Sequence, residues 1–115
     1  MQLSEIVALI DGEVIVGEDK LEQNIRFGFS SDLMSDVLAF VEGETILLTG
    51  LNNAQVIRTA EMLDMKVITL VRGKRPSQEI IDLARENDIV VVTTRHTLFA
   101  ASGILYQNGL EAMSV

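Results

Sequence analysis

The sequence contains no cysteine and no tryptophan, and it has one histidine and one proline. Without cysteine, the chain cannot form a disulfide, a thiolate zinc site or a cysteine-ligated iron–sulfur cluster. The longest segment without Asp, Glu, Lys or Arg covers residues 96–110, which is too short and too polar to span a bilayer. The amino terminus carries Glu5 and resembles no secretory signal. We therefore expect a cytoplasmic protein with no membrane contact, no metal site and no cofactor.

Positive charge is also scarce. Seventeen acidic residues against nine basic residues give a net charge of −8, which argues against nucleic acid as a partner. Residues 1–55 hold ten acids and two bases, whereas residues 56–115 hold seven of each. Three of the bases, Arg72, Lys74 and Arg75, fall within four consecutive positions. The sequence thus describes an acidic protein with one concentrated basic loop.

The second half of the chain has a regular alternation of elements. Continuous apolar strands are predicted at residues 45–48, 66–71 and 89–92, and helices at 54–63, 76–86 and 97–107. Either Pro76 in the first turn or Ser77 as the cap suits the start of the second helix. Continuous apolar strands are typical of a parallel sheet covered on both faces. The pattern predicts one compact three-layer α/β domain, residues 1–115, with a mainly parallel sheet and short βα units.

The first half has weaker patterns. We expect a helix over residues 3–10, a short strand at 14–16, and a strand at 25–29 with Ile25, Phe27 and Phe29 on one face. The oxygens of residues 30–32 are expected to cap a following helix. Its predicted apolar stripe consists of Leu33, Met34, Val37, Leu38 and Val41.

Four loops are predicted to follow strands and precede helices, at residues 30–32, 49–53, 72–77 and 93–96. Ligands of open parallel sheets bind at the carboxyl ends of the strands, and helix N-termini favour anions. Cations at a helix N-terminus oppose its dipole, so the basic loop implies an anionic counterpart, either a ligand or the acidic half of another subunit. The candidate ligand-binding residues are Ser31, Asp32, Thr49, Gly50, Asn52, Arg72, Gly73, Lys74, Arg75, Thr94 and His96.

Enzymatic interpretations have weaker support. Gly73-Lys74 resembles the end of a P-loop, but Arg75 replaces the required Ser or Thr. A nucleophilic pair of Ser30 or Ser31 with His96, or a Mg²⁺ site at Asp32 and Asp36, would need geometry that the sequence does not specify. Loop and capping roles explain these residues equally well. We therefore predict no catalytic residues and no enzymatic activity.

Several segments share features with one family. Residues 31–38 and 46–51 carry the similarity first, and it extends through residues 55–63 and 72–76 to Thr94, Thr97, Phe99 and residues 103–106. Together they resemble the DRTGG domain family, in particular its short stand-alone members. Thr49-Gly50 matches the Thr-Gly of the family name, while Leu51 stands at the second Gly. If Asp32 is the Asp of the name, Leu33 stands at the Arg, and a register set by Asp36 likewise places no Arg there.

The resemblance implies a regulatory role. DRTGG domains are related to the N-terminal domain of HPr kinase and to a regulatory domain of phosphotransacetylases, and they often mediate dimer contacts. We therefore expect a non-catalytic regulatory domain that binds a small phosphate-bearing ligand or nucleotide and forms a homodimer. The alternative is a protein–protein interaction subunit of a larger metabolic or redox complex without a ligand of its own.

Overall fold

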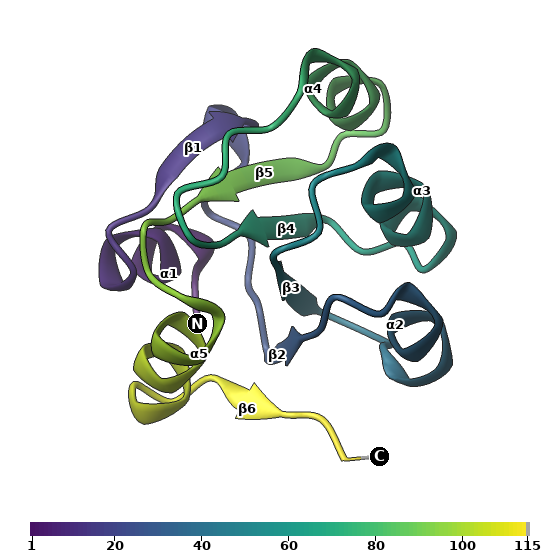
Figure 1. Cartoon of the computed structure of the whole chain (residues 1–115). Helices are drawn as coiled ribbons and strands as arrows, with labels where there is room; N and C mark the ends of the chain where they lie inside the picture. Colours follow the sequence, from purple (N-terminus) through teal and green to yellow (C-terminus); the bar gives the residue numbers. More distant parts are fainter. Residues whose placement is uncertain (115) are drawn as a thin grey trace.

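A six-stranded sheet lies between two layers of helices in the computed structural model, which describes residues 1–114 (Figure 1). The strands are β1 (Glu13–Val16), β2 (Phe27–Ser30), β3 (Thr45–Thr49), β4 (Val67–Leu70), β5 (Val90–Thr93) and β6 (Glu111–Ala112). The helices are α1 (Leu3–Leu9), α2 (Met34–Phe40), α3 (Ala54–Met62), α4 (Gln78–Glu86) and α5 (Leu98–Gln107), with a short 3₁₀ turn at Glu18–Lys20. No helix within this range is long and apolar enough to cross a bilayer.

The strand order is β1-β5-β4-β3-β2-β6. Strands β2 to β5 run parallel, β6 is parallel to β2, and β1 is antiparallel to β5 at the opposite edge. Thr49 pairs with Leu70 and Leu70 with Thr93, so the carboxyl ends of β3, β4 and β5 are level. The α/β class and the mainly parallel sheet predicted from the sequence are confirmed.

The side chains of each strand alternate between two apolar layers. Leu47 and Ile68 face α2, α3 and α4, whereas Ile46, Leu48 and Val90 face α1 and α5. Figure 1 shows the first group of helices along the right of the sheet and the second group on the left. Burying one such side chain contributes about 1.5–3 kcal/mol, and β3, β4 and β5 are buried at every position because both faces are covered.

Three of the helices begin at side-chain caps. Asn53, Ser77 and Thr97 accept hydrogen bonds from the backbone N–H of Gln55 (3.0 Å), Ile80 (3.3 Å) and Ala100 (3.2 Å), respectively. Helix α4 therefore starts after Ser77, which resolves the choice between Pro76 and Ser77. These caps occupy N–H groups at the helix starts that the sequence had suggested for an anion.

The structure of the first half of the chain differs from the sequence-based predictions at strands β2 and β6. Strand β2 begins at Phe27, so Ile25 lies before it and is buried with the α1 and α5 layer, whereas Phe29 packs on the opposite layer. The predicted common face of Ile25 and Phe29 is therefore wrong. Strand β6 was not predicted, because two residues carry no periodic signal.

Helix α2 also departs from expectation. Its N-cap is Leu33, without a side-chain hydrogen bond, because Asp32 is engaged elsewhere. Met34, Val37 and Val41 are buried as predicted, but Leu33 and Leu38 are exposed.

Candidate functional site

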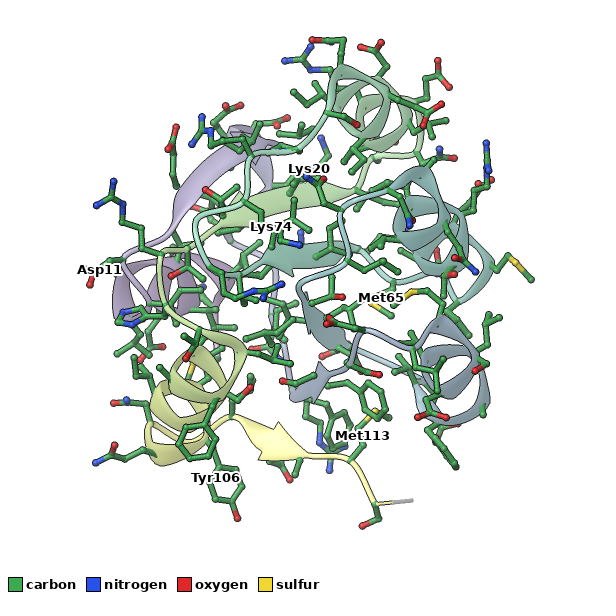
Figure 2. All side chains as sticks on the ribbon, viewed as in Figure 1. Asp11, Lys20, Met65, Lys74, Tyr106 and Met113 are labelled. Atoms are coloured by element: carbon green, nitrogen blue, oxygen red, sulfur yellow. The ribbon has the colours of Figure 1, made fainter. Side chains whose placement is uncertain are left out.

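The predicted loops meet at the carboxyl edge of the sheet. Figure 2 shows Lys74 near the ends of β4 and β5, and Asp11 at the left margin of the same view. The eleven candidate residues divide into two groups there. One surrounds Gly50 at the end of β3, and the other links the loop after β4 to the loop after β5.

Asp32 organises the first group. One carboxylate oxygen, Oδ1, accepts hydrogen bonds from the Gly50 N–H at 2.6 Å and the Thr49 hydroxyl at 2.9 Å. The Gly50 bond is the main reason that the pKa of Asp32 lies below its usual value, with further lowering from the Thr49 bond and the charges of Arg72 and Lys74, while burial opposes the shift. Asp32 is therefore an anion at neutral pH, and it joins the loops after β2 and β3.

Two cations of the basic loop lie over Gly50. The Lys74 ammonium donates a hydrogen bond to the Gly50 carbonyl at 2.6 Å. A Cβ atom added at Gly50 would lie 2.8 Å from Nη2 of Arg72, so the missing side chain leaves the space that the guanidinium occupies. Within residues 1–114 this guanidinium makes no hydrogen bond and no ion pair, and the Arg72 residue is exposed.

Arg75 has its counterpart in the same chain. Its Nη1 donates to Oε1 of Glu13 at 2.7 Å and its Nη2 to Oε2 at 3.4 Å. This pairing lowers the pKa of Glu13 and raises that of Arg75. Sequence reasoning missed Glu13, although it belongs to the acidic half that was considered as an anionic counterpart. The antiparallel position of β1 brings this carboxylate to the carboxyl edge.

Asn52 spans the two groups. Its Nδ2 donates to the Arg75 carbonyl at 2.9 Å, while its Oδ1 is buried with no hydrogen-bond partner in the described part of the chain. The neighbouring Leu51, at the second Gly of the family name, is half-buried against the apolar layer of α2, α3 and α4. Ser31 closes a local turn, because its hydroxyl accepts from the Leu33 N–H at 3.0 Å.

The second group fixes the backbone of the basic loop. Arg72 and Gly73 both have positive φ, 60° and 67°. Their N–H groups donate to the carbonyls of His96 (2.9 Å) and Thr94 (2.8 Å), so neither amide is left for an anion. The left-handed conformation is costly for an arginine, and these two bonds hold it in place.

Thr94 and His96 also hold the backbone of the basic loop in place. The Thr94 hydroxyl donates to the Ile10 carbonyl at 2.7 Å and accepts from the His96 N–H at 3.2 Å. Nε2 of His96 lies 3.7 Å from Oδ2 of Asp11. Gly73, Thr94 and His96 thus position Arg72 by holding its loop.

The catalytic alternatives receive no support from these contacts. The Ser30 hydroxyl is hydrogen-bonded to that of Ser102 at 2.6 Å, and the side-chain partner of His96 is Asp11. Among residues 1–114, no group of three or more His, Asp or Glu side chains is placed to hold a metal ion.

The edge also holds a polar hollow of about 260 Å³ on the β1 side. It is lined by Asp11, Glu13, Gly73, Arg75, Thr93, Thr94 and Arg95. Its lining includes two arginines and two carboxylates, of which Arg75 and Glu13 are paired, so the hollow carries no excess of positive charge. Arg72, whose guanidinium has no hydrogen bond or ion pair to residues 1–114, does not line this hollow and lies over Gly50 instead.

The chain is similar to known proteins along most of its length. The DRTGG domain model matches residues 5–107. A cobalt-dependent inorganic pyrophosphatase of Clostridium perfringens (strain 13 / Type A) is 45% identical over 51 residues, which are 43% of this chain and 9% of that protein.

A solved structure shares the fold. The CBS and DRTGG domains of the regulatory region of Clostridium perfringens pyrophosphatase, complexed with the activator diadenosine tetraphosphate, superpose with a TM-score of 0.73 at 24% identity. The match covers 95% of this chain and 47% of that one, so the chain spans about half of the solved regulatory region.

Proposed function

Because the chain belongs to the DRTGG domain family, we propose that it is a non-catalytic regulatory domain that binds a small phosphate-bearing ligand at the carboxyl edge of its sheet. The observation that carries the proposal is the Arg72 guanidinium, which lies over Gly50 with no hydrogen bond or ion pair to residues 1–114. Lys74 and Arg75, by contrast, already have partners in the chain.

Arg72 is well suited to bind a phosphate. A guanidinium presents several N–H donors in a fixed plane that matches two phosphate oxygens. Its backbone conformation, with φ at 60°, is strained for a residue with a side chain and is held by the bond to the His96 carbonyl. Strain of this kind clusters at binding sites, where the surrounding structure maintains it.

The carboxylate of Asp32 indicates which kind of phosphate-bearing ligand fits the site. Its Oδ2 accepts no hydrogen bond from residues 1–114, and it lies 3.4 Å from the position that a Gly50 Cβ would occupy, beside Nη2 of Arg72. A carboxylate next to the guanidinium repels a bare anion but accepts from a hydroxyl. A phosphate attached to a group with hydroxyls, such as the sugar of a nucleotide, satisfies both side chains.

The proposal is tested by thermal unfolding in the presence of candidate ligands. Suitable probes are inorganic phosphate, acetyl phosphate, ADP, ATP and diadenosine tetraphosphate. A ligand at 100 times its Kd stabilises the folded state by about 2.7 kcal/mol. We expect stabilisation by a nucleotide and little by inorganic phosphate.

The matched variants are Arg72→Gln and Arg58→Gln, which remove the same charge. Arg58 is exposed on α3, in the layer away from α1 and α5. Arg72→Gln is expected to abolish the ligand-induced shift, whereas Arg58→Gln keeps it. Absence of stabilisation by every probe, or an equal shift in both variants, contradicts the proposal.

A second candidate function is a protein–protein interaction module without a ligand of its own. It is favoured by the exposed aromatic side chains of α5, Phe99 and Tyr106, and by the internal pairing of Arg75 with Glu13. Because Arg75 is paired with Glu13 within the chain, it is not free to bind a phosphate-bearing ligand or another external acidic group. On this alternative, the ligand probes fail while association of the chain with a partner persists.

A further inference from the structure

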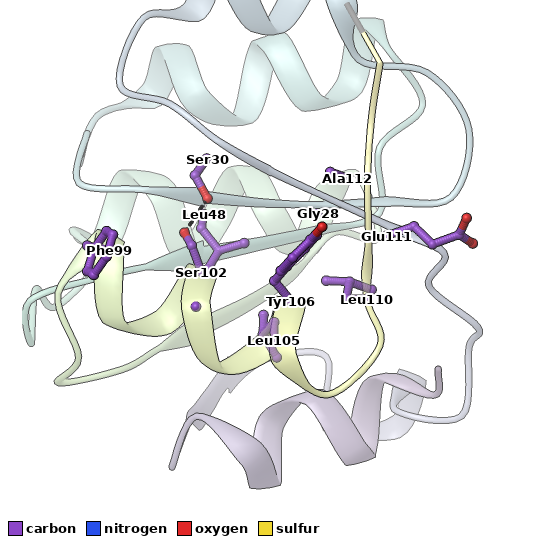
Figure 3. A pocket seen from close by; sticks show the side chains of 11 residues that line it. Gly28, Ser30, Leu48, Phe99, Ser102, Leu105, Tyr106, Leu110, Glu111 and Ala112 are labelled. Atoms are coloured by element: carbon purple, nitrogen blue, oxygen red, sulfur yellow. Dashed lines mark hydrogen bonds between the residues drawn. The ribbon is translucent and has the colours of Figure 1, made fainter.

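A hollow of about 340 Å³ opens between α5 and the strands β2 and β6 (Figure 3). Small residues on the facing elements create it, because Gly28 of β2 and Ser102 and Gly103 of α5 supply little side-chain volume. A Cβ atom at Gly103 would meet nothing within 4 Å. Small-molecule sites measure about 300–1,000 Å³ and are mostly apolar, as this hollow is at Leu48 and Leu105.

Two aromatic rings line the hollow from α5. Phe99 is 90% exposed and Tyr106 is 70% exposed. Their spacing of seven residues is two helical turns, so both rings lie on one side of the helix. Figure 3 shows the hydroxyls of Ser30 and Ser102 between these rings. An exposed aromatic ring has a free face on which a flat ligand ring can stack.

The hydroxyl pair offers an acceptor to a ligand. The Ser102 hydroxyl donates its single proton to the Leu98 carbonyl at 2.6 Å. The contact of 2.6 Å between Ser30 and Ser102 therefore uses the proton of Ser30. Two lone pairs remain on the Ser30 oxygen, and no donor within residues 1–114 reaches them. Glu111 adds carboxylate oxygens at the rim, one of which accepts from Arg26 at 3.2 Å.

These groups select a flat, uncharged ligand that donates a hydrogen bond. The acceptor oxygens repel an anion, and the cation beside the hollow, Arg26, is already paired with Glu111. An alkyl chain would cover the Ser30 oxygen without offering it a proton, which is unfavourable. A purine base with an exocyclic amino group is flat and uncharged, and its N–H₂ group donates.

The hollow lies next to the proposed phosphate site. Ser30 pairs in register with Leu48, and both residues line the hollow. Two residues further along the chain from each come Asp32 and Gly50, where the Arg72 guanidinium lies. Two residues of strand advance by about 7 Å, a gap that the ribose of a nucleotide spans between its base and its phosphates.

We propose that the hollow beside α5 binds the base of the phosphate-bearing ligand, and that this base is a purine with an exocyclic amino group. The base stacks on the ring of Phe99 or Tyr106 and donates to the Ser30 oxygen, while the phosphate binds Arg72. The inference rests on the proposed function, since it assigns the remainder of the same ligand. It makes the domain selective for one kind of nucleotide.

Filling the hollow at Gly103 tests the inference without disturbing the core. Gly103→Leu occupies the space that the base needs, and leucine is a better helix former than glycine. In calorimetric titrations of the whole chain, ADP is expected to bind Gly103→Leu about tenfold more weakly than wild type. The matched control is Ala39→Leu, exposed on α2 at the opposite face of the sheet, which is expected to bind ADP as wild type does.

Tyr106 supplies a second measurement, because it is the single tyrosine of a chain without tryptophan. We expect ADP to change its emission, whereas inorganic phosphate, which reaches Arg72 alone, leaves it unchanged. Purine riboside 5′-diphosphate differs from ADP only by lacking the amino group. It is expected to bind about fivefold more weakly, the value of one hydrogen bond.

The variants separate failure of this inference from failure of the proposed function. If Arg72→Gln weakens ADP binding and Gly103→Leu does not, the phosphate site stands, the hollow is left to a protein partner, and the inference is overturned. Equal affinity for ADP and purine riboside 5′-diphosphate overturns the role of the amino group. Weaker binding in Gly103→Leu alone overturns the proposed function and keeps the base in the hollow. Absence of ADP binding to wild type overturns both.

Discussion

At the scale of single residues, Asp32 connects the parts of the candidate site. One carboxylate oxygen binds the backbone of Gly50 and the hydroxyl of Thr49, and the charges of Arg72 and Lys74 lie nearby. If Asp32 is the aspartate of the family name, this chain has Leu33 where the name calls for an arginine. The positive charge beside Asp32 comes instead from the loop after β4.

The role of Asp32 can be measured through pH. Its pKa is lowered in the folded state, so its contribution to stability is complete above its unfolded pKa and is lost as pH falls through the folded pKa. Asp32→Asn is expected to cost about 1.5 kcal/mol at pH 7, the low end of the value of hydrogen bonds to a charged group, because Asp32 is exposed and solvent screens its charge. Urea titrations at about pH 7, 5 and 3 should show the gap between variant and wild type closing at the lowest pH.

Asp36→Asn is the control for this prediction, because Asp36 is exposed on α2 and makes no ion pair within residues 1–114. A constant gap for Asp32→Asn across the pH range would contradict the role assigned to its charge.

The residues of the site differ in how far the sequence could reveal them. Thr49, Gly50 and Arg72 were predicted together because parallel strands end at one edge, a rule that needs no side-chain detail. Glu13 was not predicted, because its contact with Arg75 depends on the direction of β1. The division of the basic loop into paired and unpaired cations depends likewise on side-chain geometry that no spacing encodes.

At the scale of secondary structure, elements with strong signals were predicted and short ones were not. Strands β3, β4 and β5 are mostly apolar and are buried at every position, and α3 to α5 start at capping residues. Strand β2 is short and half-buried, so its start was misplaced. The predicted cap at Asp32 failed because a backbone amide of another loop competes for the same carboxylate.

The cap of α4 provides a test at this scale. Ser77→Ala removes the acceptor for the Ile80 N–H and is expected to lower the free energy of unfolding by about 1 kcal/mol. Ser35→Ala is the matched control, because Ser35 is exposed on α2 and makes no side-chain hydrogen bond within residues 1–114. Chemical denaturation of both variants measures the difference, and equal stability of the two would place the helix start elsewhere.

At the scale of the whole molecule, the charge asymmetry of the chain is partly compensated within the fold. Glu13 in the acidic first half forms an ion pair with Arg75 in the second half. Arg26 in the first half forms one with Glu111 in the second half. The net charge of −8 remains, in a body with a radius of gyration of 12.3 Å. At low ionic strength, screening acts over about 30 Å, so the charges repel across the entire molecule.

Salt should therefore stabilise the folded chain. We expect the melting temperature to rise when NaCl is increased from about 0.01 to 0.15 M, where screening acts over about 8 Å. The double variant Glu5→Gln/Glu22→Gln, at two exposed positions without ion pairs in the described structure, should melt higher at low salt and respond less. A melting temperature that falls with salt would mean that the surface ion pairs outweigh the net repulsion.

The antiparallel strand β1 also sets the order in which the chain can assemble. Val14 of β1 pairs with Val92 of β5. Because β1 is synthesised before β5, it cannot join the sheet until β5 has left the ribosome. At about 5–20 residues per second, the wait is several seconds. During that time its apolar residues and the Glu13 carboxylate lack their native neighbours. Completion of the basic loop and its acidic partner is therefore a late event of synthesis, after the parallel units have formed.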